Sequence, residues 1–246
     1  MITLEGKRAL VCGGTSGIGK ATVEALKENG AKVVILSRSA SGENAISCDL
    51  EDLDTLTLLV NKEIENNGNF EILINNSGGP PSGPLIDATP NEFEKAFLRH
   101  VLASQTLVQL LLPGMKASQY GRIINIISTS VKAPIPGLGV SNTIRAAVAN
   151  WAKTLSLELG SYGITVNNVL PGFTNTNRLK SLIEKKSSIL GKSKIEVENE
   201  MKKSVPLNRF GEASEVANAA IFLSSPAASY INGINLPVDG GRTSSL

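Results

Sequence analysis

The sequence predicts an α/β fold, a single domain in which helices cover both faces of a doubly wound parallel sheet. Short, continuous apolar runs alternate with longer segments whose apolar residues recur at helical spacing. Continuous apolar strands are typical of parallel sheets, which are buried on both faces. A glycine-rich turn follows the first run, where such folds bind ligands. We expect strands at residues 8–12, 32–36, 71–74, 122–127, 164–170 and 233–238, and helices at 19–29, 92–116, 142–159 and 214–223.

Length and composition are those of an ordinary globular chain. The 246 residues are 41% hydrophobic and 19% charged, so we interpret residues 1–246 as one domain with a sizeable core. A net charge of +2 gives no electrostatic basis for nucleic-acid binding. No apolar run reaches the roughly 20 residues of a membrane span, and the N-terminus does not have the pattern of a signal peptide. We therefore expect a cytoplasmic protein without a membrane or nucleic-acid partner.

The two cysteines, Cys12 and Cys48, fall at the ends of expected strands and lack the spacing of a disulfide framework. We interpret both as small buried hydrophobic residues. The sequence indicates no metal site.

Two segments interrupt the regular alternation. After residue 36 only a short stretch precedes the next apolar run at 45–48, and a parallel crossover normally needs about a dozen residues or more. We expect the crossover helix to be missing there and the strand at 45–48 to be a stunted edge strand. Residues 173–204, rich in Lys, Ser and Glu, form an insertion at the ligand edge, the usual position of a substrate lid.

The glycine-rich turn predicts a dinucleotide site and a Rossmann-type fold. Gly13 permits a tight turn, Gly17 lets the backbone approach a pyrophosphate, and Gly19 allows the following helix to pack closely on the sheet. The helix N-terminus supplies unpaired N–H groups and partial positive charge. The residues expected to cradle the pyrophosphate are Gly13, Thr15, Ser16, Gly17, Ile18 and Gly19.

The end of the second strand carries Ser37 and Arg38, where an acidic residue would favour NAD(H). A small hydroxyl followed by a guanidinium suits the 2′-phosphate of NADP(H), which Arg holds by two charge-assisted hydrogen bonds. We therefore expect NADP(H) to be preferred over NAD(H). The alternative is that Arg38 is an ordinary surface arginine.

Further motifs follow the turn in a fixed order. They are Cys48-Asp49-Leu50, Asn75-Asn76-Ser77-Gly78, residues 121–128, residues 163–167, Pro171-Gly172 and residues 238–241. With these motifs the chain resembles, over nearly its whole length, the classical short-chain dehydrogenase/reductases of the 3-oxoacyl-acyl-carrier-protein reductase-like group. The resemblance implies an NAD(P)(H)-dependent oxidoreductase that transfers hydride to or from a small carbonyl or alcohol. It also implies further cofactor-binding positions at Asp49, Leu50, Asn76, Gly78, Pro171, Gly172, Thr174 and Thr176.

The catalytic positions depart from this family. Ser128 matches the serine that orients the substrate carbonyl. The family's Tyr-x-x-x-Lys pair, thirteen residues further on, is replaced by Ser141 and Arg145, and the family's relay asparagine by His100. Arg145 can still donate to the ribose hydroxyls of the cofactor, but an alkyl hydroxyl is a far weaker acid than a phenol.

Two functions therefore remain open. In the first, the chain is an oxidoreductase with altered proton donation, through His100, whose ordinary pKa suits proton transfer, or through a water held by Ser141. In the second, it is a catalytically silent dinucleotide-binding protein, a redox sensor or an assembly partner. We favour for His100 the simpler interpretation of a helix histidine bound by a backbone carbonyl.

The resemblance also implies a homodimer or homotetramer. Relatives pair through the helices that correspond to residues 92–116 and 142–159, which form isologous four-helix contacts. These two segments carry abundant apolar residues, so more than one of their faces is expected to be buried, and ordinary core packing explains part of this. The apolar residues include Leu107, Leu110, Leu111, Val148 and Trp151.

Overall fold

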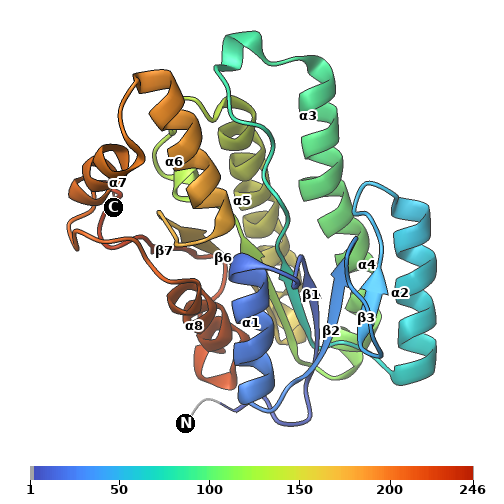
Figure 1. Cartoon of the computed structure of the whole chain (residues 1–246). Coiled ribbons are helices and arrows are strands. Elements are labelled where there is room, and N and C mark those ends of the chain that lie inside the picture. The colour runs from blue at the N-terminus through green and yellow to red at the C-terminus, as the bar shows by residue number, and fades with distance from the viewer. Residues whose placement is uncertain (1–2, 246) are drawn as a thin grey trace.

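The computed structural model describes residues 3–245, and its centre is a parallel sheet with helices on both faces (Figure 1). The seven strands follow the spatial order β3-β2-β1-β4-β5-β6-β7, and every paired neighbour is parallel. The strands are β1 Arg8–Cys12, β2 Lys32–Ser37, β3 Ala45–Ser47, β4 Ile72–Asn75, β5 Gly121–Ile126, β6 Ile164–Pro171 and β7 Asn235–Val238. The predicted fold class is confirmed, and so is the short edge strand that follows β2 without a crossover helix.

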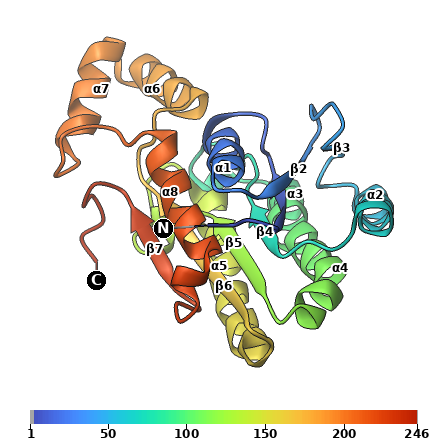
Figure 2. The ribbon, with the colours of Figure 1, turned by 90° about the horizontal axis from the view of Figure 1, so that it is seen from below.

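Two helical layers bury the sheet (Figure 2). On one face, α1 (Gly17–Glu28) and α8 (Ala213–Ser224) pack Leu26 and Val216 against strand residues such as Val11. On the other face lie α2 (Leu53–Asn67), α4 (Ala103–Ala117) and α5 (Gly139–Leu159), with Leu56 and Leu107 in the second core. Burial of apolar residues on both faces, at about 25 cal/mol per Å², drives the formation of this sandwich.

Helix α2 was not predicted. Asp52 caps it, because its carboxylate accepts a hydrogen bond from the Thr55 amide at 3.0 Å. Leu56 and Val60, one turn apart, are fully buried. The sequence analysis was also incomplete at 92–116, where α3 (Pro90–Phe97) runs through a π-helical turn at Leu98–Leu102 into α4.

The inserted segment 173–204 folds into two helices, α6 (Asn177–Leu190) and α7 (Lys194–Lys203). Their buried residues form a small core of their own, made by Leu179, Ile183, Val197 and Met201. Figure 1 shows this pair beyond the carboxyl ends of the strands, across from α3. Lys185 fastens α6 to the segment after β4, since its ammonium donates to the carbonyl and the hydroxyl oxygen of Ser82, each at 2.8 Å.

A row of asparagine side chains crosses the sheet. Each amide nitrogen donates to the amide oxygen of the next residue, from Asn75 to Asn125 at 2.9 Å and from Asn125 to Asn168 at 2.8 Å. Asn168 donates in turn to Asn235 at 2.8 Å. These residues are register partners on β4, β5, β6 and β7. Because a one-residue slip would leave buried amides unpaired, the row fixes the strand register.

Both cysteines are buried and unpaired. Burial raises the pKa of Cys12 to about 12 and also raises the pKa of Cys48. Both thiols are therefore neutral, and their expected role as small buried residues is confirmed. Among the described residues no helix is long and apolar enough to cross a membrane.

Candidate active site

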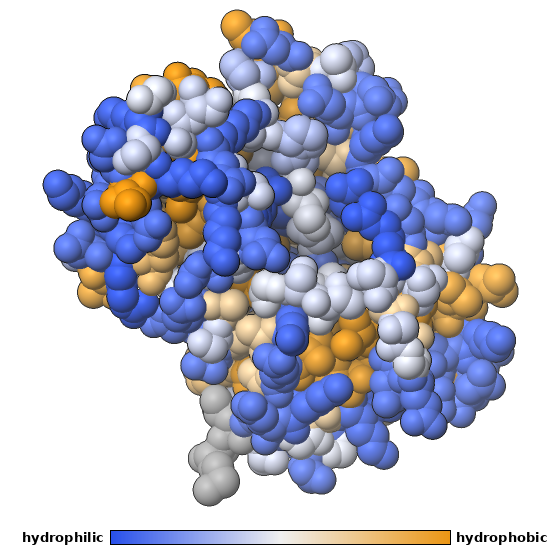
Figure 3. Space-filling model, viewed as in Figure 1, coloured by the Kyte–Doolittle hydropathy of each residue, from blue (hydrophilic) through white to orange (hydrophobic). Residues whose placement is uncertain are grey.

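The strand order reverses between β1 and β4, so the segments that follow these two strands meet at the carboxyl edge of the sheet. The glycine turn leaves β1, and residues 76–83 leave β4. In the space-filling view this edge is hollowed between α6 and α3, and mostly hydrophilic residues border the hollow (Figure 3). All the candidate site residues lie around this edge.

The glycine turn has the conformation that its sequence predicts. Gly13 has a φ of +63° and Gly17 a φ of +53°, both in the left-handed region that favours glycine. A methyl group on Gly19 would overlap the carbonyl oxygen of Gly13 and lie 2.7 Å from Nδ2 of Asn76. The same Asn76 amide donates to the carbonyls of Cys12 and Gly13, each at 3.3 Å. The turn is therefore held from both sides in a shape that excludes side chains.

Helix α1 starts at this turn with free amides. Its N-cap residue Ser16 forms no side-chain cap, and its first turn contains no acidic residue. Thr176 faces Gly17 from the start of α6, because a methyl group on Gly17 would lie 3.4 Å from the Thr176 Cγ2. Uncapped N–H groups at a helix N-terminus bind phosphate, so this cradle fits the pyrophosphate of a dinucleotide.

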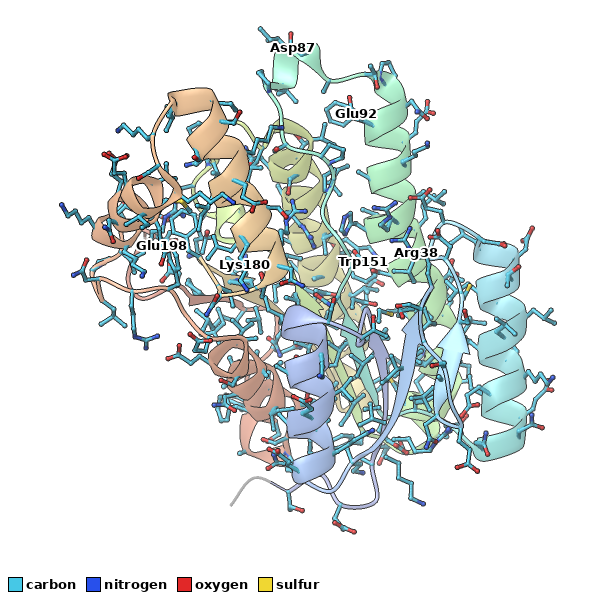
Figure 4. The ribbon with its side chains drawn as sticks, viewed as in Figure 1. Arg38, Asp87, Glu92, Trp151, Lys180 and Glu198 are labelled. Carbon is cyan, nitrogen blue, oxygen red and sulfur yellow. The ribbon has the colours of Figure 1, made fainter. Side chains whose placement is uncertain are left out.

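The end of β2 presents a cluster of hydroxyls and one guanidinium. Thr15 Oγ1 accepts hydrogen bonds from Ser37 Oγ at 3.4 Å and from Ser39 Oγ at 3.2 Å. Arg38 points away from the sheet (Figure 4) and forms a loose ion pair with Asp49, Nη1 to Oδ2 3.8 Å. The Arg38 side chain is 75% exposed, and a pair of this kind contributes only about 0–1 kcal/mol. Arg38 is thus free to turn to a phosphate. The sequence analysis missed Ser39.

The other expected cofactor positions lie along the same edge. Leu50 is packed against the core, and Ile18 lies in the first turn of α1. Gly78 has open space where a side chain would be. The remaining positions follow β6. A methyl group on Gly172 would approach Asp239 to 2.7 Å, so the backbone of Gly172 lies close to Asp239. The hydroxyl of Thr174 donates to the Gly172 carbonyl at 3.2 Å. Pro171 is the last residue of β6.

Ser128 follows β5 at the centre of this edge. Its hydroxyl oxygen accepts a hydrogen bond from the Ser130 amide at 3.0 Å, which fixes its orientation. Ser141 lies in the first turn of α5 and is buried. No tyrosine takes over the missing position, because Tyr120, Tyr162 and Tyr230 come just before β5, β6 and β7, at the amino edge of the sheet.

Arg145 is buried one turn after Ser141. Its Nη1 donates to the Ile126 carbonyl at 3.0 Å and its Nη2 to the Ser77 carbonyl at 3.4 Å. Burial, and next the charge of Arg178, lower the pKa of Arg145 to about 10. The guanidinium therefore remains protonated at neutral pH, and a cation stands where relatives of the predicted family have lysine.

His100 lies in the π-helical turn, a type of irregularity frequent at functional sites. Its Nδ1 shares a hydrogen bond with the Ser77 hydroxyl at 2.6 Å, while Nε2 has no protein partner among the described residues. His100 lines a small cavity together with Asn75 and Arg145. Burial, then the charges of Arg145 and Arg99, lower the pKa of His100 to about 2, although the Gly78 backbone favours the protonated ring.

This environment corrects the less favoured of the two interpretations of His100 and agrees with a structural role for it, with the Ser77 hydroxyl as a partner. The ordinary pKa of histidine suggested that His100 could donate a proton near neutrality, but a ring with a pKa of about 2 is neutral there. His100 therefore cannot be the cationic acid. It is instead a neutral residue that orients Ser77, which the sequence analysis did not single out.

The titration of His100 gives a test of this environment. His100 is the only histidine in the chain, so in a tag-free protein its ring signals in NMR spectra are unambiguous. We expect these signals not to shift between pH 8 and pH 5. The unfolded chain binds a proton below its pKa near 6.5 and the folded protein does not, so stability falls as the pH falls. From pH 6.5 to pH 5 the loss is about 2 kcal/mol of unfolding free energy.

The matched control is His100→Gln, which cannot titrate. Urea unfolding at the two pH values should show a pH-dependent loss about 2 kcal/mol smaller in this variant than in the wild type. A ring that titrates near pH 6.5 would contradict the neutral, buried His100.

Comparison with known proteins agrees with this geometry. A family model described as Enoyl-(Acyl carrier protein) reductase matches residues 13–243. The chain is 32% identical to the 3-oxoacyl-acyl-carrier-protein reductase FabG of Vibrio harveyi, covering 98% of both chains. It is 30% identical to the 7alpha-hydroxysteroid dehydrogenase of Escherichia coli K12, covering 100% of this chain and 97% of the relative. The chain belongs to the short-chain dehydrogenase/reductase family.

Solved structures support the same assignment. The L-sorbose reductase of Gluconobacter frateurii, in a structure with NADPH and L-sorbose, aligns with a TM-score of 0.93 at 26% identity over 100% of this chain and 99% of that one. This protein is accordingly a short-chain oxidoreductase that acts on small molecules.

The two helical segments that were expected to pair with a second copy are partly used by the core. Leu107, Leu111 and Val148 are buried inside the chain itself, so core packing explains these three apolar residues. Trp151 is half-buried, with its indole N–H donating to Gln105 Oε1 at 2.8 Å. The large apolar residues left exposed on these helices include Leu157 on α5 and Leu102 before α4.

Proposed function

We propose that this short-chain oxidoreductase prefers NADP(H) and reduces a small carbonyl, or oxidises the corresponding alcohol, with altered proton donation. The observation that carries the proposal is the set of groups along one edge of the sheet. The glycine cradle follows β1, the Thr15–Ser37–Ser39 hydroxyls with Arg38 lie at the ends of β1 and β2, and the oriented Ser128 follows β5. NADP(H) is the cofactor that such an arrangement suits, and it supplies the hydride.

Side chains of this protein orient the substrate, stabilise its developing charge and supply the proton. Ser128 donates a hydrogen bond to the substrate oxygen and orients the carbonyl. Arg145 holds a positive charge beneath the site, which stabilises negative charge developing on that oxygen. A water held by Ser141 provides the proton. An enzyme without a positioned phenol has a rate lower by about 10²–10⁴, so we expect slow turnover.

The absence of the phenol favours a second candidate, a catalytically silent dinucleotide-binding protein that serves as a redox sensor or assembly partner. Fluorescence titrations with NADPH and NADH, followed by turnover assays with ketones, aldehydes and oxoacyl thioesters, distinguish the two. Cofactor-dependent reduction of any carbonyl supports the enzyme. Tight NADPH binding with no turnover supports the silent protein.

Arg38 gives a direct test of the cofactor preference. We expect Arg38→Ala to weaken NADPH binding at least tenfold and to leave NADH binding unchanged, because charge-assisted hydrogen bonds contribute about 1.5–3 kcal/mol. Lys32→Ala is the matched control, since it removes an exposed cation from the opposite end of β2. Equal NADPH affinity in Arg38→Ala and the wild type would refute the phosphate assignment.

We further propose that α6 and α7 act as a lid, that the protein is cytoplasmic, and that it forms a homodimer or homotetramer. The exposed Leu157 and Leu102 on the pairing helices support the last point. Light scattering after gel filtration measures the assembly directly.

A further inference from the structure

The arginines of the chain differ in what compensates their charge. Of the eight arginines, four have carboxylate partners: Arg8, Arg38, Arg99 and Arg209. Two more lie against aromatic rings, Arg122 over Tyr120 at 4.0 Å and Arg242 over Phe173 at 4.2 Å. Only Arg145 and Arg178 have neither partner among the described residues. Both belong to the candidate active site.

Arg178 reaches from the lid to the segment after β4. It is the second residue of α6, and its Nη1 and Nη2 donate to the carbonyls of Gly79 and Pro80 at 3.4 and 3.3 Å. These bonds are long and therefore weak. A side chain on Gly79 would displace the guanidinium, because a methyl group there would lie 2.9 Å from Nη2. The sequence analysis missed Arg178, which keeps further N–H donors for a ligand.

Arg145 approaches the same segment from the sheet side, through its bond to the Ser77 carbonyl. The two guanidiniums thus flank residues 77–80 and are close enough for Arg178 to lower the pKa of Arg145. Arg99, the nearby third cation, is already paired with Glu51. Arg145 is buried, whereas Arg178 is exposed. A buried charge without a counter-charge is costly, so Arg145 gives the site a preference for an anion, and the exposed Arg178 is free to contact one.

The cofactor pyrophosphate is one anion that could satisfy Arg178. Its expected cradle, however, is the start of α1 with Thr176, next to Gly17. Arg178 extends away from that cradle to Gly79 and Pro80, and Lys185 binds the same segment further along at Ser82. The guanidinium is therefore placed between the lid and the segment that continues from Gly78, on the substrate side.

We propose that Arg178, supported by Arg145, recognises an anionic group on the substrate, so that the enzyme acts on carbonyl compounds carrying a carboxylate or phosphate. This proposal rests on the proposed reductase function of the same site. Arg178 is a specificity residue in it, and Arg145 supplies the second positive charge. A guanidinium binds either anion through paired hydrogen bonds.

The test compares matched substrates that differ in charge. A 2-oxo acid is paired with its methyl ester, and dihydroxyacetone phosphate with dihydroxyacetone, each with NADPH as reductant. We expect the wild type to prefer one or both anionic partners. In Arg178→Gln the KM for the preferred anion should rise about 10- to 100-fold, as for the loss of a charge-assisted hydrogen bond. The KM for the neutral partner and the Kd for NADPH should stay within about twofold. The substrate pair whose anionic member loses affinity in Arg178→Gln shows whether the recognised group is a carboxylate or a phosphate.

Lys186→Gln is the control, because it removes the same charge from an exposed position of the same helix. It should change none of these constants. Equal use of charged and neutral substrates by the wild type would overturn the proposal. So would a tenfold loss of NADPH affinity in Arg178→Gln, which would assign Arg178 to the cofactor phosphates.

A binding experiment separates this proposal from the proposed function. Oxamate and inorganic phosphate are titrated into the protein with NADPH bound, and the nicotinamide fluorescence is followed. Saturable binding of either anion that Arg178→Gln weakens tenfold or more supports the anion site, even if no carbonyl is turned over and the reductase function fails. Absence of binding by both anions, in a protein that reduces neutral carbonyls, overturns the anion site and leaves the reductase function in place.

Discussion

Gly19→Ala is expected to abolish useful dinucleotide binding, with an affinity for NADPH about 100-fold below that of the wild type. The added methyl group overlaps the Gly13 carbonyl oxygen and approaches Asn76 Nδ2 to 2.7 Å. The flexible end of a side chain cannot relieve this overlap, since the first obstacle is backbone. Overpacking of this kind costs about 1–3 kcal/mol, and a distortion of the turn also displaces the amides that face the pyrophosphate. Fluorescence titration with NADPH measures the affinity, and urea unfolding measures the accompanying loss of stability.

Gly83→Ala is the matched control for this prediction. Gly83 lies in the segment after β4, has no atom within 4 Å of an added methyl group and does not have a positive φ. It should keep the wild-type affinity and stability. An affinity of Gly19→Ala equal to that of the wild type would mean that the turn does not bind the dinucleotide.

Most of the fold could be predicted because the central strands are buried on both faces. Every residue of β5 is buried, so its apolar character was visible without knowledge of any partner. The edge strand β3 was predicted from the apolar run at 45–48 and from the length of the connection that precedes it, because this connection from β2 is too short for a helix. These features depend on local sequence and simple geometry.

Helix α2 escaped prediction because its pattern is mixed. Leu56 and Val60 are buried, but Leu58 between them is 68% exposed, which blurs the apolar stripe. Its N-terminal signal, Asp52 three residues before Thr55, was present in the sequence. A search for capping residues would have found the helix.

The site was predictable where the backbone conformation determines the residue. Gly13 and Gly17 have positive φ values, and such positions favour glycine in any sequence. The environment of His100 was not predictable, because its lowered pKa depends first on its burial and then on Arg145, a residue of a different helix. Nor was the contact between Arg178 and Gly79, which are 99 residues apart. Contacts of this kind arise only when α6 packs over the segment after β4.

The second large effect is an expected rise in kcat when the family's catalytic pair is restored. The double variant Ser141→Tyr/Arg145→Lys places a phenol and an ammonium one helical turn apart on α5, at the two positions that correspond to the family's Tyr-x-x-x-Lys pair. A phenol is a much better proton donor than an alkyl hydroxyl, and the adjacent ammonium lowers its pKa. A positioned general acid contributes about 10²–10⁴ in rate. We therefore expect kcat to rise by a factor in that range for a carbonyl that the wild type reduces slowly, with NADPH affinity unchanged.

The single variants separate the two contributions. Arg145→Lys keeps the charge but cannot reproduce both hydrogen bonds, to Ile126 and Ser77, so it should lower stability by about 1 kcal/mol without raising kcat. Ser141→Tyr alone should raise kcat less than the double variant, because Arg145 is occupied by these two carbonyls. The double variant could bind NADPH as tightly as the wild type and still reduce no carbonyl. This result would show that the missing proton donor is not what prevents the reaction. The site would then hold a dinucleotide without positioning a substrate, which is the behaviour of a sensor and not of a slow enzyme.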